Sequence, residues 1–191
     1  MRKNLSLMAG LLLVLASSGC FLLGNYPTTW EGRYAQATQE LAAAADDLHR
    51  FYALDDAAKA AFELGKVEEA QAHAQHALDL APRFRADWNY GNAIHDGHMV
   101  LGRVALRKGD MAAAKRELLE AGRTPGSPQL NTFGPNMSLA KDLIERKETD
   151  TVVAYFDLCG KFWEMERGNL KRWSILAKAG EVPDFGANLV Y

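Results

Sequence analysis

The chain has 191 residues, of which 48% are hydrophobic and 24% are charged, and its formal net charge at pH 7 is −2. A hydrophobic content of this size, with four tryptophans, excludes a disordered chain. The slightly acidic balance with interspersed signs offers no basic surface for nucleic acid, so no nucleic-acid partner is expected.

The first residues have the pattern of an export signal. Arg2 and Lys3 give a positive start, an apolar run covers residues 5–16, and three small residues precede Cys20. The apolar run is too short to span a bilayer as a stable helix. We therefore predict that residues 1–19 are a lipoprotein-type signal peptide and that the protein is exported.

The sequence LASSGC before the cleavage point resembles a bacterial lipobox, in which the cysteine becomes the acylated amino terminus. Leucine is usual three positions before that cysteine, whereas Ser17 stands there; general signal-peptidase cleavage after Ser18 is the alternative. Lipidation of Cys20 would imply a membrane anchor and an outer-membrane lipoprotein facing the periplasm. The alternative is a soluble periplasmic or secreted protein, in which a disulfide between Cys20 and Cys159 becomes possible.

Removal of residues 1–19 leaves 172 residues with a formal charge of −4, which is enough for one core of ordinary size. We expect residues 20–27 to be a linker and residues 28–191 to be a single helical-repeat domain. Apolar residues at steps of 3 and 4 predict an amino-terminal helix over residues 30–49. This helix either bends at Arg50 or continues into the next one.

Residues 51–82 are predicted to form two antiparallel helices, because small residues stand where two helices must touch and a glycine stands where the first helix must end. These positions follow at steps of 7, 5, 7 and 5, and they are Ala58, Gly65, Ala70, Ala77 and Pro82. The steps 7, 5 and 7 return at Gly102, Gly109, Ala114 and Ala121.

This spacing resembles the tetratricopeptide repeat. The resemblance implies an all-α fold of stacked antiparallel hairpins in a right-handed superhelix, with two or three repeats near residues 51–84, 86–122 and 135–167. It also implies a concave groove for a protein or peptide. The two turn glycines are 44 residues apart, whereas a plain repeat has 34, and we expect the ten extra residues, 85–94, to extend the third helix at its start.

One helical stripe combines packing glycines with histidines. Gly91, His95, His98, Gly102 and Ala105 recur at steps of 4, 3, 4 and 3, with Asn92 and Asp96 close by. A functional interpretation is a metal or small-ligand site formed by Asn92, His95, Asp96 and His98. A structural interpretation is that the rings are partly buried and hydrogen-bonded to polar neighbours.

The segment of residues 123–136 contains three prolines and two glycines, which predicts a long loop without regular structure, either functional or packed through Leu130 and Phe133. A helix over residues 136–147 is expected next, with Pro135 in its first turn. Its partner helix, which begins at residue 149 or 150, completes a degenerate third hairpin that lacks the glycine turn.

The chain is expected to end in a capping helix over residues 170–179 and an extended tail, both part of the folded body because they are rich in large apolar residues. Residues 89–191 are also similar to small bacterial proteins of unassigned function.

No catalytic motif is present, so we expect neither an enzyme nor a bound cofactor. The favoured hypothesis is an envelope-anchored scaffold or assembly factor that binds a protein or peptide. The alternative is a small-ligand or metal-binding periplasmic protein, with enzymatic activity as one version of it, centred on His95, His98 and the 123–136 loop.

Overall fold

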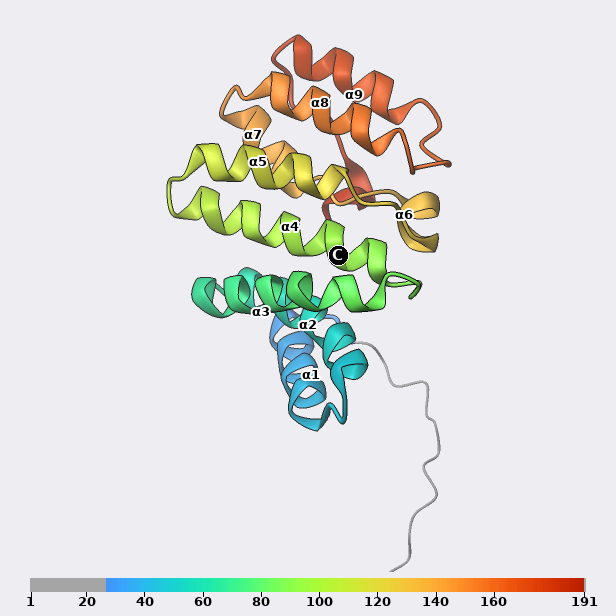
Figure 1. The fold of residues 1–191 in the computed structure, drawn as a ribbon. Coiled ribbons are helices and arrows are strands. Elements are labelled where there is room, and N and C mark those ends of the chain that lie inside the picture. The colour runs from blue at the N-terminus through green and yellow to red at the C-terminus, as the bar shows by residue number, and fades with distance from the viewer. Residues whose placement is uncertain (1–26, 191) are drawn as a thin grey trace, which may run out of the picture.

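The computed structural model describes residues 27–190, and within this range the chain is all-helical, with nine α-helices, two 3-10 helices and no strand. Residues 1–26, and with them the predicted signal peptide and Cys20, lie outside the described residues. The helices form an elongated stack, with α1 and α2 at one end and α8 and α9 at the other (Figure 1).

The elements in chain order are α1 (Trp30–Ala43), α2 (Asp47–Glu63), α3 (Val67–Leu80), η1 (Ala81–Phe84), α4 (Tyr90–Arg107), α5 (Met111–Gly122), α6 (Pro128–Phe133), α7 (Ser138–Glu145), α8 (Thr149–Cys159), α9 (Asn169–Lys178) and η2 (Gly186–Leu189). Helices α2 and α3 form one pair, α4 and α5 a second, and α7 and α8 a third. Helix α3 packs against α4, α5 packs against α8, and α9 covers α8. Each pair is therefore joined to the next by a helix–helix contact.

The turns inside the first two pairs have the same hydrogen bonds. After α2, the amide of Lys66 donates to the carbonyl oxygen of Ala61 at 2.9 Å, and after α4 the amide of Asp110 donates to that of Ala105 at 2.9 Å. The residue before each donor is a glycine, with φ of 76° and 80°. This arrangement is the Schellman motif, which requires a left-handed residue and therefore favours glycine.

The third pair has the same turn without a glycine. The amide of Glu148 donates to the carbonyl oxygen of Leu143 at 2.9 Å, and Lys147 has φ of 66°. As predicted, no glycine stands at this turn; Lys147 adopts the left-handed conformation that glycine adopts at the other two turns.

Small residues lie at the contacts between helices. Five of the predicted alanines are exposed by 2% or less, namely Ala58, Ala70, Ala77, Ala114 and Ala121. A Cβ atom on Gly102 would lie 2.3 Å from Cδ2 of Leu139, so a larger residue there would require the buried Leu139 side chain to move. Pro82 is exposed in the short helix η1, where it ends the preceding helix.

The first helix is shorter than predicted. It ends at Ala43, and α2 begins at Asp47, so the break does not fall at Arg50. Asp46 explains the position of the break, because its side chain accepts a hydrogen bond of 2.9 Å from the amide of His49 and caps the new helix.

The ten extra residues 85–94 only partly extend the helix that follows the first pair, which is α4. Helix α4 starts at Tyr90, and the residues before it form turns. In these turns Oδ1 of Asp87 accepts a bond of 2.8 Å from the amide of Asn89, and Oδ2 of Asp87 accepts one of 2.7 Å from the hydroxyl of Tyr52. The local Asx turn and its contact with α2 compete with helix here.

The predicted loop of residues 123–136 contains helix α6, so the expectation of no regular structure was wrong. Ser127 caps this helix by accepting a bond of 3.0 Å from the amide of Leu130, and a proline occupies the first helical position. Leu130 anchors the segment with 6% exposure, whereas Phe133 is 75% exposed. Helix α7 begins at Ser138, so Pro135 lies outside its first turn.

The carboxy-terminal segment is part of the folded body, as predicted. Trp173 and Phe185 are each 2% exposed, and their rings meet edge to face at 4.9 Å. The tail is not wholly extended, since it forms η2. There the side-chain amide of Asn188 donates to the carbonyl oxygens of Phe133 and Pro135 at 3.1 and 2.9 Å, which fastens the tail to the segment after α6.

We predict that Lys147→Gly stabilises the protein by about 0.5–1 kcal/mol, because it removes the cost of placing a side chain in the left-handed region. Gly109→Ala, at the equivalent turn of the second pair, is the matched change in the opposite direction and should destabilise by about 1 kcal/mol. Urea unfolding of both variants measures these differences. A loss of stability in Lys147→Gly would show that the lysine side chain stabilises the turn by contacts of its own.

Candidate functional site

Most of the predicted polar residues lie on α4, the central helix of the stack. Helix α4 packs against α3 and α5 and also contacts α2. Because it is covered on several sides, residues at alternate positions from Gly91 to Met99 are buried, and polar side chains there need partners from other helices. The partners come from α2, α5 and α8 and from the connection around α6.

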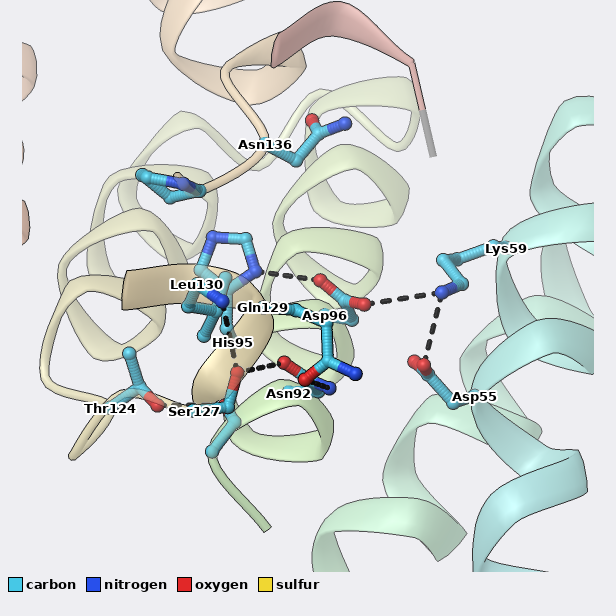
Figure 2. Close-up of polar contacts among 12 residues, drawn as sticks. Asp55, Lys59, Asn92, His95, Asp96, Thr124, Ser127, Gln129, Leu130 and Asn136 are labelled. Carbon is cyan, nitrogen blue, oxygen red and sulfur yellow. Dashed lines mark hydrogen bonds and ion pairs between the residues drawn. The ribbon is translucent and has the colours of Figure 1, made fainter. Parts of the chain in front are cut away.

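A lysine of α2 joins the first pair to the second (Figure 2). The ammonium of Lys59 lies 3.0 Å from Oδ2 of Asp55 on its own helix and 3.2 Å from Oδ2 of Asp96 on α4. It also lies 3.5 Å from Oδ1 of Asp56. The side chains of Lys59, Asp55 and Asp96 are only 12–13% exposed, whereas that of Asp56 is 40% exposed. The cluster is therefore buried with one edge open to solvent.

A histidine of α4 continues the chain of contacts toward the third pair. Nδ1 of His95 lies 2.6 Å from Oδ1 of Asp96, and Nε2 lies 3.2 Å from the hydroxyl of Tyr155 on α8. That hydroxyl donates to the carbonyl oxygen of Asn136 at 3.0 Å. His95 and Tyr155 are completely buried. We use the name polar seam for five largely buried side chains, those of Asp55, Lys59, Asp96, His95 and Tyr155.

The charges of the polar seam shift the pKa values of its members. Burial raises the pKa of Asp55 to about 8, helped by the charges of Asp96 and Asp56 and opposed by Lys59. Burial alone would raise the pKa of Asp96 as well, but the charge of Lys59 and the bond from His95 outweigh it and hold that pKa well below 3.8. The carboxylates likewise outweigh burial at Lys59 and raise its pKa well above 10.5. Of the two largely buried carboxyls beside the Lys59 ammonium, Asp96 is therefore the ionised partner, and Asp55 holds its proton more strongly.

The two predicted histidines do not converge. His98 is turned to α5, where its Nδ1 lies 2.8 Å from Oε2 of Glu117, while His95 belongs to the polar seam. Among residues 27–190, no group of three or more histidine, cysteine, aspartate and glutamate side chains is placed to hold a metal ion. The geometry corresponds to the structural interpretation, in which each ring joins α4 to a different helix.

Asn92 fastens the connection around α6 to the start of α4. Its side-chain oxygen accepts from the hydroxyl of Ser127, and its amide lies 3.4 Å from Oε1 of Gln129 (Figure 2). Beside it, the hydroxyl of Thr124 donates to the carbonyl oxygen of Gly91 at 2.7 Å. A Cβ atom on Gly91 would overlap the carbonyl oxygen of Gly126, so glycine is required for this close approach.

Sequence reasoning found Asn92, His95, Asp96 and His98 but missed their partners. Lys59 and Asp55 carried one weak signal, because they stand four residues apart on an otherwise alanine-rich helix and could pair there. Tyr155 and Glu117 carried none, since their role depends on helices that are distant in sequence. Cys159 is completely buried and has no disulfide partner among the described residues, and burial raises its pKa.

The chain matches no family model, and no curated protein or solved structure is significantly similar to it. No helix within residues 27–190 combines the length and the apolar character needed to cross a bilayer.

We predict that stability depends on pH through Asp55. The folded chain keeps a proton on this carboxyl up to about pH 8, whereas the unfolded chain releases it near its ordinary value of 3.8. Between these two pH values the folded state therefore binds more protons than the unfolded state. Stability falls as the pH rises from the lower value to the higher, by at most about 1.4 kcal/mol per pH unit. The low pKa of Asp96 acts only at acidic pH and does not affect this window.

Asp55→Asn imitates the protonated carboxyl and should remove this dependence. Denaturant unfolding between pH 6 and pH 9 compares wild type with Asp55→Asn and with Asp56→Asn, the neighbouring and more exposed carboxyl. The wild type should lose stability relative to Asp55→Asn as pH rises, whereas Asp56→Asn should follow the wild type. Parallel curves for wild type and Asp55→Asn would contradict the assignment.

Proposed function

We propose that this protein is an exported, envelope-anchored helical-repeat protein of the tetratricopeptide-like type, which binds a protein or peptide partner. The observation that carries the proposal is the recurrence of one turn. The same Schellman hydrogen bonds close the pairs α2–α3, α4–α5 and α7–α8, and alanines at matching positions pack the first two. A stack of similar helix pairs has an extended surface formed by successive first helices, and such surfaces bind other chains.

The proposed binding surface is the face shared by α2 and α4, the first helices of two successive pairs. Its open edge contains the partly exposed carboxylate of Asp56 and the partly exposed amide of Asn92. Behind them, the ion pair of Lys59 and Asp96 joins α2 to α4, so these two side chains are already held in place before a partner arrives. Carboxylate and amide groups of this kind match the backbone and polar side chains of an extended peptide.

The anchor is the second part of the proposal. Acylation of Cys20 would place the folded body at a membrane surface, at the end of a linker of residues 20–27. A partner in the cell envelope, at the periplasmic face of the outer membrane, is consistent with this position. Incorporation of a fatty-acid probe that is lost in Cys20→Ser tests the anchor independently of the partner.

Site-specific photo-crosslinking in cells tests the binding surface. A photoreactive amino acid at Asp56 should capture a defined envelope protein, because this position lies at the open edge between α2 and α4. The same group at Ala72, which is exposed on α3, is the matched control and should not capture that protein. Equal capture from both positions, or capture from Ala72 alone, would refute the α2–α4 face as the binding surface.

A further inference from the structure

The first end of the stack has an apolar groove between α1 and α2. Its volume is about 350 Å³, and it is lined by Ala43, Ala44, Tyr52 and Ala53, with Glu40 and His49 as its polar residues. The alanines make it shallow and smooth, so the edge of another helix would fit against them. Only residues of α1, of α2 and of the turn between them line this groove, and α1 lies at the end of the stack (Figure 1).

The last end of the stack presents a complementary helix edge. Ile175 of α9 is 61% exposed, and its neighbours on the same helical stripe are Lys171 and Lys178. An isoleucine between two lysines, one turn away on each side, is an apolar projection with cationic flanks.

A second groove lies beside this stripe, between α8 and α9. Its volume is about 610 Å³, and Val153 of α8 and Gly160, which directly follows α8, line it opposite Ser174 and Ile175 of α9. The small residues Gly160 and Ser174 leave room for a third helix, as the alanines do between helices inside the stack. Each end of the stack therefore has both a groove and a helix that borders it.

The charges of the two terminal helices are opposite. Helix α9 has three basic residues and no acidic one, and these are Lys171, Arg172 and Lys178. Helix α1 has two exposed acidic residues, Glu31 and Glu40. Its single basic residue, Arg33, is partly buried, and its Nε donates to the carbonyl oxygen of Pro27 at 3.1 Å. Helix α1 would therefore attract helix α9 of another copy.

We propose that copies of this chain associate head to tail. Helix α9 of one copy lies in the α1–α2 groove of the next, with Ile175 against the alanines and its lysines facing Glu40, while α1 occupies the α8–α9 groove. The two contacting surfaces differ, so the contact is heterologous and leaves a free end at each side of the assembly. This proposal does not depend on the α2–α4 binding surface, which remains open.

Crosslinking between two tagged forms of the full chain tests the arrangement. One form carries Ala43→Cys in the first groove, and the other carries Ser174→Cys beside Ile175. A short bismaleimide should join the two forms when they are produced in the same cells. The parent chain gives the background from Cys20 and Cys159, of which Cys159 is buried.

Variants at exposed positions make the test specific. Ile175→Asp in the Ser174→Cys form should lower the mixed crosslink about tenfold, the loss expected when one isoleucine no longer finds an apolar site. Lys171→Glu with Lys178→Glu should lower it as well, and Glu40→Lys on the other form should restore part of it. Circular dichroism checks that each variant is folded.

The other outcomes overturn the proposal. A mixed crosslink no stronger than the parent background means that the ends do not meet. A dominant crosslink between two Ser174→Cys chains means that the association is symmetric. A crosslink from Ala43→Cys to a different protein means that another partner occupies the groove.

Discussion

The packing of this protein depends on one buried charge, the ammonium of Lys59 held by Asp96 across the contact between α2 and α4. Removing both groups from water has a cost that is recovered only when the remaining polar atoms also find partners. Asp96 is hydrogen-bonded to His95, His95 to Tyr155, and Tyr155 to a backbone carbonyl. With the Lys59–Asp96 contact, these bonds join the three helix pairs by successive polar contacts. A shift of any pair would leave a buried polar atom unsatisfied, which gives the stack a single favoured arrangement.

Much of the helical architecture follows from residues whose backbone or size restricts the chain. Gly65 and Gly109 mark turns because few other residues adopt a left-handed conformation easily, and the buried alanines mark contacts because two helices meet there. The same reasoning did not identify the turn at Lys147, where an exposed lysine adopts the left-handed conformation in place of a glycine. It also failed at α6, whose cap residue Ser127 lies among prolines and glycines that indicate a loop. Local signals identify strong preferences but not the contacts that override them.

The polar residues were likewise only partly predictable from the sequence. The stripe on α4 was visible because His95 and His98 recur at helical spacing, but spacing places them on one side of a helix without saying what each one meets. Glu117 and Tyr155 come from helices 19 and 60 residues further along the chain, and they draw the two rings to different partners. The polar seam was therefore outside the reach of periodicity, although its consequence, a proton retained by Asp55 at neutral pH, is a strong chemical property of the folded state.

The polar contacts from α2 to α8 act as one unit, and a double-mutant cycle tests this coupling most directly. Asp96→Asn removes the carboxylate charge beside His95, Tyr155→Phe removes the hydroxyl on its other side, and the free energy of unfolding is measured for both single variants and the double variant. Tyr52→Phe removes a hydroxyl that bonds Asp87 outside the polar seam. Its combination with Asp96→Asn is the control pair. We expect a coupling energy on the order of 0.5–2 kcal/mol for the first pair and additivity for the control. Additive losses for Asp96→Asn and Tyr155→Phe would contradict the account.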